Sequence, residues 1–239
     1  MTGAGRGSVK KRRLTIPVPG GASVSAVLTL PLGNGEMRGT GVIAAHGAGN
    51  DMEHPLLAAF TVGLAEAGYP AMRFNFPYKE KGLKIPDPPA TLEDTWAAAC
   101  SVFREEAGIA PSRIVAAGKS MGGRIASRMV AAGTLPAAGL IFLGYPLHPA
   151  DDPSRLRDAH LHRIGVPMLF FAGTRDRLCD LAKLQTVLEK LPASWTLEVI
   201  EGGDHSFDLP KAMGIAQSDV YARIVKTSVQ WLEATFAGR

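Results

Sequence analysis

Short runs of apolar residues alternate with longer segments of helical spacing from residue 42 almost to the end of the chain. Runs that are apolar on both faces are typical of strands in a parallel sheet, because helices cover both sides of such a sheet. The predicted strands span residues 42–45, 70–74, 114–117, 140–143, 168–172 and 195–200. Together they predict a mostly parallel sheet.

Between these strands, apolar residues recur every three or four positions, which predicts amphipathic helices. Leu57, Phe60 and Leu64 share one face of the first helix, and Thr91 with Asp94 resembles a capping box at the start of the next. The later stripes are Leu92, Trp96, Ala99, Cys100 and Phe103, then Leu181, Leu184, Leu188 and Leu191, and finally Tyr221, Ile224, Val225 and Leu232. Strands alternating with helices predict a doubly wound α/β sheet, whose ligand site lies at the carboxyl ends of the strands.

Two strand patterns at 14–18 and 24–30 precede the parallel region, and the turn signal Gly20-Gly21 separates them. This arrangement predicts an antiparallel hairpin at one edge of the sheet. Two longer connections, 77–90 and 148–164, are expected to shape a pocket. Neither connection is long enough to form a separate cap domain.

The composition suits one globular domain, with 239 residues of which 46% are hydrophobic. The first 13 residues carry five positive charges and no acid, so the remaining chain has a formal charge of −1 instead of the overall +4. We therefore expect a basic flexible tail over residues 1–12 and one domain over 13–239. A charge confined to a tail makes a nucleic-acid partner unexpected.

Two further features of the sequence bear on the cellular compartment of the protein. We find no apolar run suited to a signal peptide or a membrane span, which favours a cytoplasmic protein. Cys100 and Cys179 form neither a disulfide framework nor a zinc motif and are typical of buried residues in a reducing compartment. We expect no metal and no cofactor, and the oligomeric state stays open.

The segment Gly118-Lys119-Ser120-Met121-Gly122 lies between a predicted strand and a predicted helix. A sharp turn in this setting is typical of a nucleophile elbow, where small residues must flank the serine. The helix N-terminus that follows favours negative charge developing beside Ser120. The segment also ends like a phosphate-binding loop, but position 113 is arginine where that motif needs glycine, and a strand precedes it.

A serine hydroxyl needs a base to become a nucleophile, and an acid to orient that base. His205 and Asp176 follow the last two predicted strands, which gives the order serine, acid, histidine expected for this fold. Asp176 has a simpler interpretation as a helix cap. The alternative acids are Asp180, Asp151 and Asp152, whereas Asp204 is too close in sequence to His205 to orient its ring easily.

An acyl-transfer site also needs two backbone N–H groups that bind the oxyanion. Met121 supplies the first, and Ala48 in the loop His46-Gly47-Ala48-Gly49 is expected to supply the second, with Gly47 as the alternative. We expect His46 to hold this loop. The tentative substrate-binding residues are His46, Gly47, Arg73, Asn75, Tyr78, Lys119 and His148. Arg73 and Lys119 would suit an acidic substrate, although surface or inter-strand pairing explains them more simply.

The motifs resemble the α/β-hydrolase superfamily, on its dienelactone-hydrolase-like side. They are His46-Gly47-Ala48-Gly49, Gly118-Lys119-Ser120-Met121-Gly122-Gly123, Gly173-Thr174-Arg175-Asp176 and Gly203-Asp204-His205. Three further segments are similar to a small, poorly characterised bacterial branch, whose relatives include a testis-expressed protein and a subunit of a chromatin acetyltransferase complex. These are Arg73-Phe74-Asn75-Phe76-Pro77-Tyr78, Pro86-Asp87-Pro88-Pro89 and Gly144-Tyr145-Pro146-Leu147-His148-Pro149. The resemblance implies the fold and the triad, and a serine replaces the cysteine nucleophile of dienelactone hydrolases proper.

The sequence thus predicts a serine hydrolase that acts on a small or medium acyl substrate, most simply a carboxylic ester. Its expected partner is that small molecule, with no membrane involved. The alternative is a binding or scaffold module that keeps the fold without turnover, and cofactor-free perhydrolysis or lyase chemistry on the same triad is a third possibility.

Overall fold

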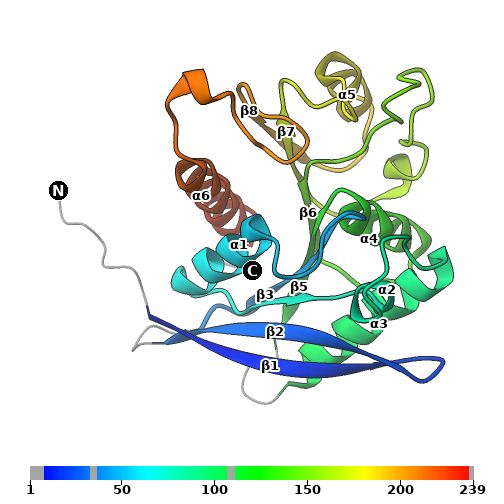
Figure 1. The fold of residues 1–239 in the computed structure, drawn as a ribbon, viewed down its shortest axis with the longest axis vertical. Helices are drawn as coiled ribbons and strands as arrows, with labels where there is room; N and C mark the ends of the chain where they lie inside the picture. The colour runs from blue at the N-terminus through cyan, green and yellow to red at the C-terminus, as the bar shows by residue number, and fades with distance from the viewer. Residues whose placement is uncertain (1–7, 33–36, 107–110, 237–239) are drawn as a thin grey trace.

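The computed structural model describes residues 8–32, 37–106 and 111–236. Eight strands form one sheet in the order β1-β2-β4-β3-β5-β6-β7-β8 (Figure 1). The strands are β1 (Ser8–Val18), β2 (Ala22–Leu32), β3 (Thr40–Ala45), β4 (Ala71–Phe74), β5 (Arg113–Lys119), β6 (Gly139–Leu143), β7 (Met168–Gly173) and β8 (Trp195–Ile200). All six strands predicted for the parallel region are confirmed.

The N-terminal hairpin lies at the sheet edge, as predicted. Strands β1 and β2 pair antiparallel from Ser8 opposite Leu32 to Val18 opposite Ala22, and β2 pairs antiparallel with β4. The remaining neighbours, from β4 through β3 to β8, pair parallel. The structure therefore has the predicted mostly parallel, doubly wound sheet.

The prediction of a flexible tail over residues 1–12 is wrong for residues 8–12. Strand β1 begins at Ser8, because the long partner strand β2 offers pairing positions for every residue back to that point. Lys10 and Lys11 are exposed on this edge strand, a position that tolerates charged side chains. Residues 1–7 lie outside the described part of the chain.

Helices cover both faces of the sheet. They are α1 (Pro55–Glu66), α2 (Pro77–Glu80), α3 (Pro89–Glu105), α4 (Met121–Ala132), α5 (Leu181–Leu188) and α6 (Gln217–Phe236), with 3-10 turns η1 (Leu161–Arg163) and η2 (Lys211–Met213). Helices α1 and α6 pack on one face, and α3, α4 and α5 on the other (Figure 1). Helix α2 falls inside the connection that we expected to be a loop.

The predicted capping box at Thr91 and Asp94 is wrong, because α3 already begins at Pro89. Pro88 precedes the helix without a side-chain capping bond, and a proline at the first helical position needs no hydrogen-bond acceptor for its nitrogen. The helix thus starts three residues earlier than the capping pattern suggests, with Pro88 in place of Thr91 as its N-cap.

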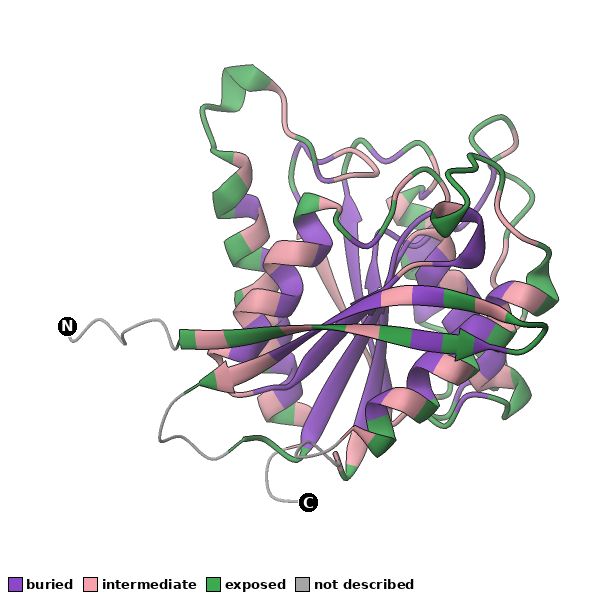
Figure 2. Ribbon diagram, turned by 60° about the horizontal axis from the view of Figure 1, so that its bottom comes forward, coloured by how far each residue is buried: buried purple, intermediate pink, exposed green. Residues whose placement is uncertain are grey.

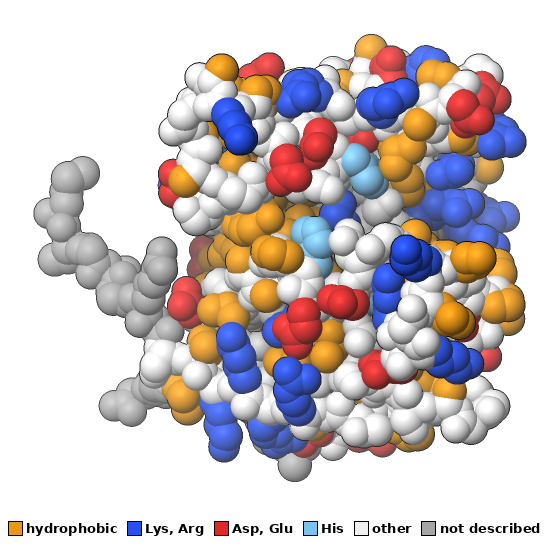
Figure 3. Space-filling view, in the orientation of Figure 1, with side chains coloured by type: hydrophobic (Ala, Val, Ile, Leu, Met, Phe, Trp, Pro, Cys, Tyr) orange, Lys and Arg blue, Asp and Glu red, His pale blue; other side chains and the backbone are white. Residues whose placement is uncertain are grey.

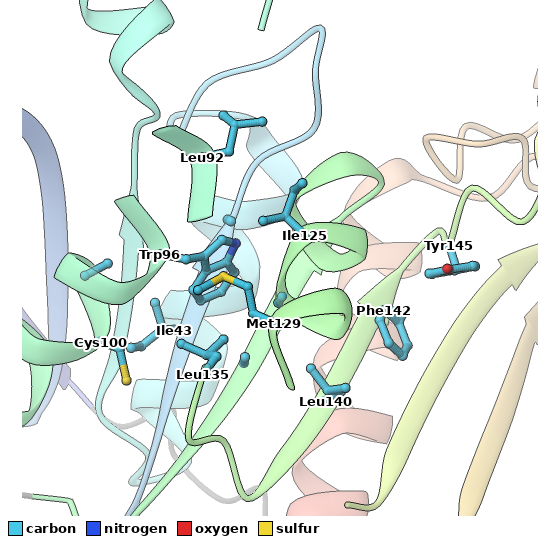
Figure 4. Packing of buried hydrophobic residues seen from close by; sticks show 14 of the residues in the cluster. Ile43, Leu92, Trp96, Cys100, Ile125, Met129, Leu135, Leu140, Phe142 and Tyr145 are labelled. Carbon is cyan, nitrogen blue, oxygen red and sulfur yellow. The ribbon is translucent and has the colours of Figure 1, made fainter. Parts of the chain in front are cut away.

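The sheet separates two hydrophobic clusters, since alternate residues of each strand point to opposite faces. Ile43 of β3 belongs to the cluster beneath α3 and α4, whereas Val42 and Ala44 belong to the cluster beneath α1 and α6. The central strands are buried along their whole length (Figure 2). In Figure 4, Trp96 of α3 lies beside Ile43 and Met129 in the first cluster.

The loops at the carboxyl ends of the parallel strands carry the predicted site residues. Within the described ranges, no separate cap domain covers this end of the sheet. No helix in the same ranges has the length and apolar character needed to cross a membrane. The connection after β4 instead contacts the loop after β3 through Tyr78 and Ala48, and Gly144, directly after β6, lies beside the ring of His205.

Candidate active site

Ser120 occupies the turn between β5 and α4 with φ 49° and ψ −114°. It is one of only two non-glycine residues with positive φ in the described part of the chain. Such backbone strain persists only where the surrounding structure enforces it. Here the turn is so tight that a Cβ on Gly118 would collide with the backbone of Gly123, and one on Gly122 would lie 2.6 Å from the carbonyl oxygen of His46.

The structure brings Ser120, His205 and Asp176 together in one hydrogen-bonded chain. His205 Nε2 lies 2.8 Å from Ser120 Oγ, and His205 Nδ1 lies 2.8 Å from Asp176 Oδ2. The Asp176 carboxylate is fully buried, and its other oxygen accepts a bond from the backbone N–H of Leu178 at 2.8 Å. Because an ionised carboxylate only accepts, Nδ1 carries the proton and Nε2 is left to accept from the serine hydroxyl.

Three of the other acids considered from the sequence have different partners, and the fourth, Asp151, is exposed. Asp180 caps α5 by accepting the N–H of Lys183 at 3.0 Å, which is the helix-capping role that we considered for Asp176. Asp152 bonds the backbone and hydroxyl of Ser154. Asp204 accepts from two backbone N–H groups of its own turn. Among the described acids, only Asp176 bonds the ring of His205.

The loop after β3 lies directly against the nucleophile turn. A Cβ on Gly47 would lie 3.4 Å from Ser120 Cβ, which places this backbone beside the serine. Met121 is the first residue of α4, where backbone N–H groups have no acceptor within the helix. The two predicted oxyanion donors are therefore the residue after Ser120, Met121, and the residue after the neighbouring Gly47, Ala48.

His46 is completely buried and bonded at both ring nitrogens. Its Nε2 accepts from the backbone N–H of Phe76 at 3.1 Å, so Nδ1 carries the proton and donates to Gly47 O at 2.8 Å. Burial lowers the pKa of His46 to about 4, so the ring is neutral at pH 7. Its contacts join the loop after β3 to the segment after β4.

Three tentative substrate-binding residues also bond this loop. Tyr78 is buried and donates its hydroxyl proton to Ala48 O at 2.8 Å. Asn75 accepts from Met52 N at 2.8 Å, and Arg73 donates to Met52 O at 2.9 Å and pairs with Glu53. All three side chains therefore have hydrogen-bond partners within the protein, without a substrate.

Lys119 and His148 likewise bond protein groups. Lys119 is 2% exposed and donates from Nζ to the backbone oxygen of His205 at 2.9 Å. Burial lowers the pKa of its ammonium group, and the carboxylate of Asp176 opposes that shift. His148 donates from Nδ1 to Pro149 O and accepts the N–H of Asp180 at Nε2.

Several contributors to this site have no pattern in the sequence that marks them as part of it. Trp96 has the spacing of a core residue, yet its indole N–H bonds Gly122 O at 3.1 Å and ties α3 to the nucleophile turn. Phe207, with φ 64°, is the other strained non-glycine residue and closes the turn that follows His205. The described residues contain no cluster of three or more His, Cys, Asp or Glu side chains that could hold a metal ion.

The sheet order, the strained serine after β5 and the histidine and acid after later strands define the α/β-hydrolase class of folds. The family model described as "Alpha/beta hydrolase domain" matches residues 38–233. The chain belongs to this family.

Solved structures show the same fold over nearly the whole chain. A dienelactone hydrolase from Anabaena variabilis ATCC 29413 has a TM-score of 0.73 and 19% identity, covering 95% of this chain and 99% of that chain. A serine hydrolase without a lid from Xanthomonas campestris has a TM-score of 0.72 and 22% identity, covering 95% and 97%. Est1E from Butyrivibrio proteoclasticus has a TM-score of 0.71 and 16% identity, covering 93% and 99%.

Proposed function

We propose that this protein is a serine hydrolase that cleaves a small or medium acyl substrate, most simply a carboxylic ester. The observation that carries the proposal is the hydrogen-bonded chain from Ser120 through His205 to Asp176, with the serine held on a strained turn. A hydrogen-bond network with a purely structural role would not need the serine in this strained conformation, whereas a nucleophile presented on a sharp turn at a strand end does.

The first half of the reaction forms an acyl-enzyme. Ser120 Oγ attacks the carbonyl carbon while His205 Nε2 takes the hydroxyl proton, and Asp176 stabilises the resulting imidazolium. The N–H groups of Met121 and Ala48 bind the oxyanion of the tetrahedral intermediate. When this intermediate collapses, the carbon–oxygen bond to the alcohol breaks and His205 returns the proton to the leaving oxygen.

Water completes the cycle by the same steps in reverse. His205 removes a proton from a water molecule, whose oxygen attacks the acyl carbon, and Ser120 leaves with the proton that His205 returns. The neutral His46 supports the proposal, because it fixes the Gly47–Ala48 backbone without competing as a base. Tyr78 helps by holding Ala48 through its carbonyl, which leaves the N–H of that residue for the substrate.

The kind of substrate is proposed from chemistry and from the named neighbours. Those neighbours include a dienelactone hydrolase, a serine hydrolase without a lid and an esterase domain from a Rhodothermus marinus protein. One structure of Est1E contains ferulic acid. An uncapped strand end is consistent with acyl compounds of modest size.

A fluorophosphonate probe tests the nucleophile directly. We expect wild-type protein to be labelled at Ser120, and labelling to vanish in Ser120→Ala and His205→Ala. With a 4-nitrophenyl ester, Ser120→Ala should lower kcat on the order of 10⁴-fold or more, and Asp176→Asn somewhat less. Ser101→Ala, an exposed serine of α3, is the matched control and should keep full labelling and activity.

The same experiment distinguishes a hydrolase from the alternative, a binding module without turnover. That alternative rests on the resemblance to a chromatin-complex subunit. A module without turnover would leave the wild-type protein unlabelled and inactive on a panel of esters. Unchanged hydrolysis by purified Ser120→Ala would end the assignment of the nucleophile.

A further inference from the structure

Helix α1 has an apolar outer face, although part of that face is open to solvent. The helix has the sequence PLLAAFTVGLAE, in which the only polar residues are Thr61 and Glu66. Thr61 is fully buried and bonds the backbone of its own helix, so it does not face solvent. Ala59, Val62 and Gly63 are instead partly exposed. A helix that is apolar on all sides is normally covered on all sides, so an apolar face left partly open is typical of a binding surface.

This face of α1 forms one wall of a groove of about 410 Å³, and α6 forms the other wall. Small-molecule sites in proteins have volumes of about 300–1,000 Å³, so the groove is large enough for a ligand. The two helices nearly touch at one point, where a Cβ on Gly63 would lie 2.5 Å from Cγ1 of Val225. The apolar lining consists of Ala59, Val62 and Gly63 from α1 and of Tyr221, Ala222 and Val225 from α6.

Both helices start from the loops that hold the proposed catalytic residues. Helix α1 follows the loop after β3, in which a Cβ on Gly47 would lie 3.4 Å from Ser120 Cβ. Helix α6 follows the turn of His205, and its first residue, Gln217, donates to Phe207 O at 3.1 Å. Figure 3 shows hydrophobic side chains along the hollow that leads from the histidines near the centre toward α1 and α6, whose places Figure 1 gives. The groove therefore leads away from the catalytic end of the sheet.

The two helices then run together toward the opposite end of the strands. Gly68, just after α1, accepts from the backbone N–H of Arg38, and Glu233 near the end of α6 pairs with the side chain of the same arginine. Arg38 precedes β3, so both helices end where the strands begin. From Ala59 to Glu66, α1 rises about 10 Å, which is the length of an extended chain of about eight carbons.

We infer that the groove between α1 and α6 binds the acyl chain of the substrate, as a linear aliphatic chain of about eight carbons. This inference rests on the proposed function and specifies the acyl group that Ser120 receives. A second copy of the chain is the other occupant considered. A stable interface buries about 800 Å² on each partner and would bury Glu66 and Lys226 with the groove, whereas an alkyl chain needs only the apolar lining.

The kinetic test is a chain-length profile with 4-nitrophenyl acetate, butyrate, octanoate and dodecanoate. We expect the wild-type kcat/KM to be at least about tenfold higher for the octanoate than for the acetate, because each fully buried methylene favours binding by about fourfold. The value for the dodecanoate should fall below that for the octanoate, since its chain is longer than the groove.

A bulky side chain in the groove should remove this preference. Ala222 is exposed on α6, so Ala222→Trp fills the groove without entering the core. It should lower kcat/KM for the octanoate at least about tenfold and leave the acetate within about twofold. Val62→Ser, on the facing wall, should lower the preference by about threefold. Ala234→Trp is the matched control, because Ala234 is exposed on the same helix outside the groove, and it should keep the wild-type profile.

Direct binding separates this inference from the proposed hydrolase activity. Calorimetry on Ser120→Ala, which cannot form an acyl-enzyme, should show binding of octanamide and not of acetamide, and adding Ala222→Trp should remove that binding. If all four esters resist hydrolysis, the proposed function fails while calorimetry still decides the groove. The same chain-length profile in wild type and Ala222→Trp, or no binding of octanamide, would overturn the inference. A dimer that Ala222→Trp dissociates in sedimentation, with an unchanged chain-length profile, would assign the groove to a second copy instead.

Discussion

Lys119 shows how one buried side chain can act on a neighbouring site through the backbone. Its ammonium group donates to the carbonyl oxygen of His205, and its own backbone leads into Ser120. A buried lysine carries a desolvation cost, which lowers its pKa, so its retention calls for a compensating interaction. We assign Lys119 as a positioning residue that holds the histidine turn against the nucleophile turn.

Replacing Lys119 with methionine tests that role. The variant keeps the length of the side chain but loses the bond to His205 O, so the ring should sample less productive positions. We expect kcat to fall about tenfold, which corresponds to about 1.4 kcal/mol, while KM for a neutral ester stays within about twofold. The slower fluorophosphonate labelling of folded Lys119→Met should match the change in kcat.

Lys81→Met is the control for Lys119→Met, because Lys81 is exposed at the end of α2. It should leave both kinetic constants unchanged. A Lys119→Met variant with altered KM and normal labelling would indicate a role in substrate binding instead of positioning.

At the residue scale, the proposed triad could be predicted because its members follow apolar runs in a fixed order. The chain position of Ser120, Asp176 and His205 carries this information, since strand ends are visible in the sequence. The direction of a side chain at a strand end is not visible in the same way. Arg73 and Lys119 therefore looked available to substrate, whereas burial commits both to backbone carbonyls.

At the scale of elements, the junction of β5, α4 and the loop after β3 depends on backbones that nearly touch. Gly122 lies in the first turn of α4, where an added Cβ would lie 2.6 Å from His46 O and 2.7 Å from Ala45 O. Both obstacles are backbone atoms, so neither can move aside as a side chain would. Trp96 reinforces the junction from α3 through its bond to Gly122 O.

Gly122→Ala should therefore destabilise the protein even though alanine is the better helix former by about 1 kcal/mol. We expect a loss of about 1–3 kcal/mol from overpacking, measured by urea unfolding, together with a severe loss of esterase activity. Gly165→Ala is the control, because its added Cβ would meet no atom within 4 Å. Unfolding of Gly122→Ala at wild-type urea concentrations would contradict the close approach described here.

Element prediction succeeded where the apolar pattern was uniform and failed where other residues decided the structure. Strands β3 to β7 were visible because both of their faces are covered. Residues 8–12 looked like a tail because their side chains are mostly basic, yet an edge strand needs only backbone pairing on one side. Helix α2 is a single turn within a proline-containing connection, which is too short for a periodic pattern.

At the scale of the whole molecule, the buried His46 couples global stability to pH. Its pKa is lowered to about 4 in the folded protein, against an ordinary value of 6.5. The unfolded chain therefore binds a proton first as the pH falls, so the stability present above pH 6.5 is lost progressively down to about pH 4. The difference in pKa corresponds to about 3 kcal/mol of unfolding free energy.

Urea unfolding of wild type and His46→Gln at pH 7, 5 and 4 measures this contribution. The variant should be less stable at pH 7, because it loses the bonds to Phe76 and Gly47, but its stability should fall less steeply with acid. His160, whose pKa is also lowered to about 4 by burial, adds its own acid sensitivity to both proteins and cancels in the comparison. Parallel pH profiles for the two proteins would show that His46 does not carry the effect.

The basic edge strand β1 has a consequence for how copies of this chain meet one another. The outer side of β1 carries unpaired backbone N–H and C=O groups, which could pair with an edge strand of a second molecule. Lys10 and Lys11 are exposed there, and Pro17 removes one donor from the same strand. Two such edges repel each other until dissolved ions screen their charges. The positive charge of this strand thus opposes edge-to-edge association of two sheets, and we expect the repulsion to be strongest at low salt.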